Sequence, residues 1–219
     1  GGTGGGGRGT GSTIVAGGGT AVATPPEPLT DEQLQQGLFA DVPAGHWAKS
    51  YIEELADRKI ISGVDSSHYE PERSITREEF LKLIITAFGF TLKPDNIAFT
   101  DVASGEWYAD YVATAYKEGL VNGITETEFG VGRNITRQDA IVILERVLTK
   151  RGMEYSGGGK TYTDMDDIAD YAAKAVENLT SIGIIQGDEA GNFLPQSQTT
   201  RAAAAKMIYA AMKQGGLWS

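Results

Sequence analysis

The hexapeptide ITREEF at positions 75–80 decides how this chain is organised, because it returns twice. The copies are ITRQDA at 135–140 and TTRAAA at 199–204. The arginine of each copy lies fourteen residues after a glycine, in the pairs Gly63 and Arg77, Gly123 and Arg137, and Gly187 and Arg201. A Thr-Arg pair alone carries no information, but three copies at matched spacing indicate an internal three-fold repeat.

Apolar residues at helical spacing predict two helices in each repeat. In the first repeat, one helix runs from Trp47 to about Lys59, and a second begins at Thr76 and ends near Gly89. The second helices of the later repeats are expected to end near residues 150 and 213. The sequence therefore predicts an all-α fold of three tandem helix-loop-helix repeats.

The threonine of each motif is suited to begin a helix. Thr76 and Glu79 have the spacing of a capping box, in which the hydroxyl accepts from the third helical amide and the carboxylate reaches back. The second copy approximates this arrangement with the shorter Asp139. The third copy has Ala203 instead, so we expect it to lack the reciprocal half of the cap.

The repeats define the domain organisation. Residues 1–37 are rich in Gly and Pro and predict a flexible linker. The repeats are assigned to 38–98, to 99–160 together with a linker, and to 161–219. We expect one compact domain at 38–213 with a frayed tail after it.

Composition narrows the classes of function. The net charge of -10 argues against binding to nucleic acid or to an anionic membrane, since such proteins usually carry a basic patch. The chain lacks cysteine, which fits an exported protein, and has no apolar run long enough to span a membrane. Without an initiator methionine or a signal peptide, it is interpreted as part of a longer secreted protein. We expect no cofactor and a monomeric module.

The three arginines are candidate ligand-binding residues. Positive charge in the first turn of a helix opposes the helix dipole, which favours anions there. A guanidinium beside free helical amides can hold a carboxylate or phosphate by two hydrogen bonds. The alternative is structural: each arginine forms an inter-repeat salt bridge, for example with the Asp of the Phe-x-Asp-Val turn.

Other repeated residues also have two interpretations. Trp47 and Trp107 either pack in the core or present an aromatic face to a sugar. The aspartates of the opening turns either cap a turn or accept hydrogen bonds from ligand hydroxyls. The glycines at the helix exits either serve a left-handed turn or let a ligand approach the backbone. The aspartates are Asp41, Asp101 and Asp164, and the glycines with their preceding residues are Ser62 and Gly63, Asn122 and Gly123, and Gln186 and Gly187.

This frame resembles the S-layer homology (SLH) family over about residues 38–213. The resemblance is carried by the openings FADV, FTDV and YTDM, by Trp47 and Trp107, by the exits ISG, VNG and IQG, and by the three Thr-Arg motifs. It implies a pseudo-three-fold bundle with grooves between neighbouring repeats. It also implies that these grooves bind secondary cell-wall polymer, typically through a terminal pyruvylated N-acetylmannosamine, whose carboxylate suits the arginines.

The expected function is therefore a non-catalytic anchor that tethers a larger secreted protein to the bacterial cell surface. The third repeat departs from the family pattern: it has Tyr171 in place of Trp, Ala203 in place of an acid, and a longer opening loop. We expect grooves built from those elements to be weakened or silent. Which tryptophan faces which arginine is left open by the sequence.

The sequence gives uneven support to three other functions. A calcium loop starting at Asp164 fails, since it would need Gly and Glu where Ala169 and Ala175 stand. Catalysis has little support, because the two histidines, His46 and His68, are expected to be solvated loop residues without a catalytic partner. A helical-repeat scaffold for protein partners, with the arginines in structural salt bridges, is the main alternative.

Overall fold

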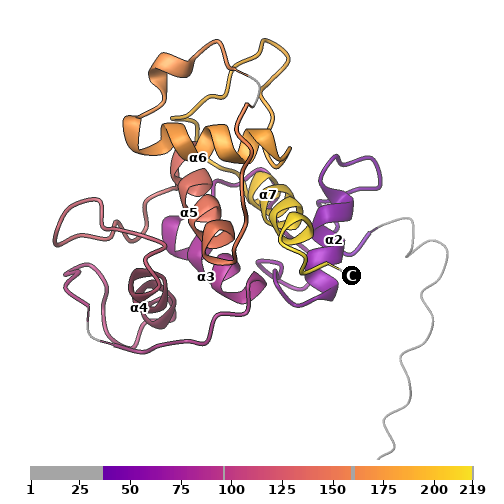
Figure 1. Cartoon of the computed structure of the whole chain (residues 1–219). Coiled ribbons are helices and arrows are strands. Elements are labelled where there is room, and N and C mark those ends of the chain that lie inside the picture. The colour runs from indigo at the N-terminus through magenta and orange to yellow at the C-terminus, as the bar shows by residue number, and fades with distance from the viewer. Residues whose placement is uncertain (1–36, 96, 159–160, 219) are drawn as a thin grey trace, which may run out of the picture.

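A computed structural model of the chain describes residues 37–95, 97–158 and 161–218. The predicted linker at 1–37 lies outside the described residues except for Gly37. Each repeat contributes one outer and one inner helix, and no strand occurs in the described ranges, which confirms the all-α prediction (Figure 1). The outer helices are α2 (Lys49–Asp57), α4 (Ala109–Lys117) and α6 (Asp170–Ser181), and the inner helices are α3 (Arg77–Ala87), α5 (Arg137–Lys150) and α7 (Arg201–Gln214).

The inner helices begin at the Thr-Arg motifs, as predicted. In α3 the Thr76 hydroxyl accepts from the amide of Glu79, whose carboxylate accepts from the amide of Thr76 at 3.0 Å. The expectation of a similar box in α5 is wrong. The shorter Asp139 does not reach back to its N-cap threonine, because its carboxylate binds Arg77 and Tyr171 instead. In α7 only the threonine half of the cap is present.

The segments that precede the inner helices meet around the pseudo-three-fold axis. The amide of Ile75 donates to the carbonyl of Thr199 at 2.9 Å, the amide of Thr199 to the carbonyl of Ile135 at 3.0 Å, and the amide of Ile135 to the carbonyl of Ile75 at 3.0 Å. These bonds form a closed ring with one member from each repeat. All three residues are buried, so the ring satisfies backbone groups that water does not reach.

The outer helix of each repeat packs on the inner helix of the repeat before it. Helix α4 packs on α3, α6 packs on α5, and α2 packs on α7, so the first repeat closes onto the last (Figure 1). This packing between neighbouring repeats joins the three repeats into one ring. It also carries the residues just before each outer helix to a neighbouring repeat.

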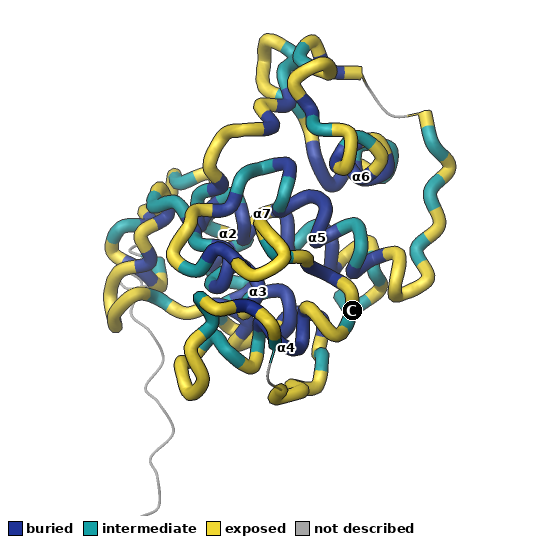
Figure 2. The backbone as a smooth tube through the Cα atoms, turned by 90° about the vertical axis from the view of Figure 1, so that its left-hand side faces the viewer, coloured by how far each residue is buried: buried dark blue, intermediate teal, exposed yellow. Residues whose placement is uncertain are grey.

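One apolar core runs through the ring and is formed mainly by the inner helices and the faces of the outer helices that meet them (Figure 2). In the predicted frayed tail, Trp218 packs against the rest of the fold. The ring of Trp218 lies 4.4 Å from the ring of Tyr209, and the guanidinium of Arg58 lies 4.0 Å above Trp218. The described fold thus extends beyond the boundary at 213 expected from the sequence.

Candidate functional site

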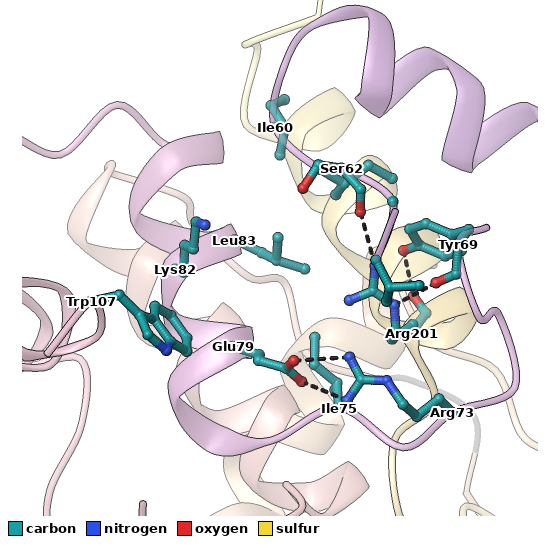
Figure 3. A pocket seen from close by; sticks show the side chains of 13 residues that line it. Ile60, Ser62, Tyr69, Arg73, Ile75, Glu79, Lys82, Leu83, Trp107 and Arg201 are labelled. Atoms are coloured by element: carbon teal, nitrogen blue, oxygen red, sulfur yellow. Dashed lines mark hydrogen bonds and ion pairs between the residues drawn. The ribbon is translucent and has the colours of Figure 1, made fainter. Parts of the chain in front are cut away.

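Grooves lie beside the three inner helices, and each is lined by residues of all three repeats. In the Arg201 groove, the exit residues 60–64 and helix α3 come from the first repeat, Trp107 from the second and Arg201 from the third. Figure 3 shows Trp107 and Lys82 at one side of this groove and Arg201 at the other. Its volume is about 210 Å³.

The other two grooves follow the same plan. The Arg137 groove, of about 280 Å³, is lined by the exit residues 184–188, helix α7, Arg137 and Trp47. The Arg77 groove, of about 240 Å³, is lined by residues 121–123, helix α5, Arg77 and Tyr171. These volumes lie near the lower end of ligand pockets in proteins, roughly 300 Å³.

The packing of each outer helix on the preceding repeat decides which aromatic residue meets which arginine. Trp47 immediately precedes the outer helix that packs on α7, and therefore enters the groove of Arg137. Trp107, just before α4, meets Arg201 in the same way, and Tyr171, in the first turn of α6, meets Arg77. Two of the three departures of the third repeat are thus separated: Tyr171 and Ala203 lie in different grooves.

Arg201 ties the third repeat to the first. Its Nε donates to the carbonyl of Tyr69 at 2.7 Å and its Nη2 donates to the carbonyl of Ser62 at 2.9 Å. Its guanidinium also lies 4.4 Å from the centre of the Tyr69 ring. Only 8% of Arg201 is exposed. The arginine therefore has a structural reason to recur, which the sequence alone did not indicate.

Arg77 and Arg137 repeat this contact between neighbouring repeats. Arg77 donates from Nε to the carbonyl of Phe129 at 3.2 Å and from Nη2 to the carbonyl of Asn122 at 3.4 Å. Arg137 donates from Nη2 to the carbonyl of Gln186 at 2.9 Å. Ser62, Asn122 and Gln186 thus enter the grooves through their main-chain carbonyls, which hold the arginines in place.

The salt bridge to the opening-turn aspartates, suggested above as the structural role of the arginines, is not formed in the described residues. These aspartates instead accept hydrogen bonds from the amides of a turn in their own repeat. Asp41 accepts from Tyr69 at 2.8 Å and from Glu70 at 2.7 Å, and Asp101 and Asp164 have the same arrangement. None of the three lines one of the three grooves. Their geometry is that of turn caps.

The exit glycines do not have the left-handed backbone expected of them. The left-handed positions lie four residues earlier, at Lys59, Gly119 and Gly183. Glycine is needed at the exits because an aromatic ring and loop carbonyls pack against the backbone. A Cβ on Gly63 would lie 2.7 Å from the ring of Phe39, and those on Gly123 and Gly187 would meet Phe99 and Tyr162 in the same way.

The groove aromatics are available to a ligand. Trp47 is 53% exposed, Trp107 50% and Tyr171 58%, which excludes core packing as their main role. The prediction that His46 is solvated is wrong, since its side chain is only 14% exposed and its ring stacks on Trp47 at 5.7 Å. His68 is exposed, as expected, and contacts Asp65.

Arg137 differs from the other two groove arginines in having a buried donor without a partner. Burial lowers the pKa of Arg137, and the weaker influence of Tyr162 and Asp164 acts in the opposite direction. The Nε of Arg137 is buried without a hydrogen-bond partner. A buried cationic donor without a partner is costly. An anion in this groove would compensate that cost.

Two lysines in the grooves were missed by sequence reasoning. Lys82 and Lys206 lie five residues after the arginine of their own motif, so alignment of the repeats could have found them. The Nζ of Lys82 lies 5.5 Å from the ring of Trp107, and that of Lys206 lies 5.9 Å from the ring of Trp47. Each of these grooves therefore presents one indole, one lysine and the arginine of a Thr-Arg motif, and the Arg201 groove is also lined by Arg73.

Within the described ranges, no cluster of three or more His, Asp or Glu residues could hold a metal ion. No helix of the described part combines the length and apolar character needed to cross a bilayer.

The S-layer homology domain family matches this chain three times, at residues 38–81, 98–141 and 161–205. The chain belongs to the S-layer homology family. The three matches coincide with the three repeats of the ring, so the module is built from three tandem SLH repeats.

Relatives of this SLH module include enzymes and S-layer proteins. It is 34% identical to an amylopullulanase of Thermoanaerobacterium thermosulfurigenes, over 78% of this chain and 9% of that protein. It is 33% identical to exoglucanase XynX of Acetivibrio thermocellus, over 77% and 16%. It is 30% identical to S-layer protein EA1 of Bacillus anthracis, over 81% and 20%. The module thus spans a fifth or less of the length of these relatives.

The enzymes match this chain only through their SLH regions, and the family together with the S-layer relatives indicates a non-catalytic anchoring module. The same relatives indicate a location at the cell surface or cell wall.

Proposed function

We propose that this SLH module tethers a larger secreted protein to the bacterial cell wall by binding an anionic secondary cell-wall polymer in its inter-repeat grooves. The proposed ligand is a terminal pyruvylated N-acetylmannosamine. The observation that carries the proposal is the Arg137 groove. There a half-exposed indole, a lysine and a partly buried guanidinium, whose Nε has no hydrogen-bond partner, surround a space of about 280 Å³.

The groove chemistry suits a sugar that carries a carboxylate. The planar guanidinium of Arg137 can accept the carboxylate by two hydrogen bonds. The indole of Trp47 offers an apolar face to the sugar ring while its edge stays wet. Lys206 adds a second cation beside that indole. The negative net charge of the chain does not oppose this, because charges more than ~8 Å apart are largely screened at physiological ionic strength.

The proposal is tested by titrating purified pyruvylated wall polymer into the module by calorimetry. We expect binding that is lost when the pyruvate ketals are removed by mild acid. A module that serves as a scaffold for protein partners would bind neither form of the polymer. Equal binding of the two forms would contradict the assignment of the carboxylate to the arginines.

The variants must separate binding from stability, because every arginine also joins two repeats. Arg77→Ala and Arg137→Ala therefore confound the two effects unless unfolding is measured beside binding. Trp47→Ala removes an exposed indole and should weaken polymer binding at least tenfold with little change in the unfolding midpoint. Leu92→Ala is the matched control, since Leu92 is an exposed apolar residue outside the three grooves.

A further inference from the structure

The three groove arginines differ at one nitrogen. On Arg77, Nη1 lies 3.3 Å from Oδ2 of Asp139. Among the described residues, no hydrogen bond or ion pair uses the Nη1 of Arg137 or of Arg201. On Arg77 and Arg201, Nε and Nη2 both donate to main-chain carbonyls. On Arg137, Nη2 donates to the carbonyl of Gln186 and Nε has no partner. Nη1 is therefore a donor that Arg137 and Arg201 both keep for a ligand.

Asp139 is held firmly on Arg77. The hydroxyl of Tyr171 donates to Oδ1 of Asp139 at 2.7 Å, and Nε2 of Gln138 donates to the hydroxyl of Tyr171 at 2.9 Å. Burial, followed by the hydrogen bond to Asp139, raises the pKa of Tyr171 to about 12. The phenol therefore remains a donor at neutral pH. A carboxylate of the chain itself thus takes the place that a ligand carboxylate would need.

The residues equivalent to Asp139 make no hydrogen bond to Nη1 of the other two arginines. In the Arg137 groove the equivalent residue is Ala203, which has no carboxylate. In the Arg201 groove it is Glu79, whose carboxylate accepts from Arg73 at 2.8 and 3.2 Å and from the amide of Thr76 at 3.0 Å. Glu79 is thereby engaged by its own repeat.

The groove lysines also distinguish the Arg77 groove from the other two grooves. Lys82 lies in the Arg201 groove and Lys206 in the Arg137 groove, each near an indole. The equivalent position in the Arg77 groove is Val142, and the aromatic residue there is the phenol of Tyr171. The Arg77 groove therefore lacks the lysine and the indole and contains an internal anion.

We propose that the module has two functional grooves, those of Arg137 and Arg201. In the Arg77 groove, Asp139 and Tyr171 block the binding of an anionic ligand. This inference rests on the proposed function and adds a binding stoichiometry of two anionic sugar ends per chain. Two sites on one rigid ring raise the avidity for a wall that displays many polymer ends, because the second contact is intramolecular.

The stoichiometry is measured with a short pyruvylated N-acetylmannosamine glycoside, which cannot bridge two grooves. We expect two sites in the wild type. In Lys206→Met and in Lys82→Met, affinity at the altered groove should fall at least tenfold, so that one site is measured in each variant. Lys174→Met is the charge control, since Lys174 lies outside the three grooves, and should keep two sites. Three sites or a single site in the wild type would overturn the inference and leave the proposed function standing. No binding at all would remove the proposed function.

Substitutions that transfer a side chain from one groove to the equivalent position of another test the role of Asp139 directly. Ala203→Asp introduces into the Arg137 groove the carboxylate that closes the Arg77 groove, and should abolish one site. Ala203→Asn, of nearly equal size but uncharged, should keep both. In the opposite direction, Asp139→Ala combined with Val142→Lys and Tyr171→Trp should create a third site in a chain whose circular dichroism is unchanged. Two retained sites in Ala203→Asp would contradict closure by a carboxylate.

Discussion

Arg201 donates to the carbonyl of Ser62 at 2.9 Å, although 139 residues separate them in the chain. This contact joins the last repeat to the first, as Arg77 and Arg137 join the other neighbours. The Thr-Arg motif therefore combines three roles. Its threonine caps a helix, Nη2 of its arginine binds a carbonyl of an exit loop, and in Arg137 and Arg201 Nη1 is left for a ligand.

Arg201→Ala is expected to lower the free energy of unfolding by about 2–4 kcal/mol. The substitution removes two charged hydrogen bonds and leaves the carbonyls of Tyr69 and Ser62 without their donors. Urea unfolding followed by circular dichroism measures the loss. Arg133→Ala is the control, since that side chain is exposed and should change stability by less than about 0.5 kcal/mol. Equal effects of the two substitutions would contradict a structural role for Arg201.

Gly123→Ala should destabilise the module by about 3 kcal/mol or more, a cost at or above the usual range for overpacking. The new Cβ would lie 2.6 Å from the ring of Phe99 and closer still to a loop carbonyl. Gly45→Ala is the matched control, because no atom lies within 4 Å of its Cβ position and its backbone is not left-handed. Thermal unfolding of the two variants compares them. A stable Gly123→Ala protein would show that the exit loop adapts.

Two of the opening-turn aspartates, Asp41 and Asp101, should make stability depend on pH in the acid range, because the fold lowers the pKa of each. Burial alone would raise the pKa of Asp101, but hydrogen bonds from Phe129, Val131 and Gly130 outweigh it and hold the pKa below its ordinary value of 3.8. The unfolded chain therefore takes up the proton first. The stabilisation is complete above the ordinary value and is lost as the pH falls through the lowered one.

The corresponding measurement is urea unfolding of the wild type and of Asp101→Asn between pH 7 and pH 2. We expect Asp101→Asn to be less stable at pH 7 and to lose less stability on acidification. Asp166→Asn is the control, because Asp166 is exposed and lies in the short 3-10 helix Met165–Asp167 that precedes α6. Parallel curves for Asp101→Asn and the wild type would refute the contribution of Asp101.

The caps of the inner helices should be separable from the arginines that follow them. Thr200→Ala removes a side chain that accepts from the amide of Ala203 at 3.1 Å, and should cost about 1 kcal/mol. Thr200→Ser keeps the hydroxyl and should restore most of that loss. Thermal unfolding measures both. Glycan binding at 25 °C should be unchanged in both variants, because neither alters Arg201.

The repeat pattern was sufficient to predict the fold class, and it placed the starts of the inner helices. It succeeded because capping and helical periodicity depend on residues close together in the chain. The helix ends were also near their predicted places, with α5 ending at Lys150 and α7 at Gln214. The same repeat pattern identified the arginines and tryptophans that line the grooves.

The partners of those residues could not be predicted, because they depend on which repeats are neighbours in space. Nothing in the sequence near Trp47 indicates that it will face Arg137 rather than Arg77. The fate of Asp139 illustrates the same limit. A local rule assigned it to the cap of its own helix, but its carboxylate instead accepts from Arg77, 62 residues earlier, and from Tyr171. Charged side chains at the junction of repeats follow tertiary electrostatics rather than local propensity.

The exchange of outer helices also fixes the copy number of the repeat. In an open array, a further unit can be added at either end, because each unit contacts only its neighbours. Here α2 occupies the face of α7 that another unit would need, and the backbone ring on the axis has one donor and one acceptor for each of three members. A gene with one repeat deleted or duplicated would encode a chain that cannot close. Such changes would be expected to arise in whole sets of three.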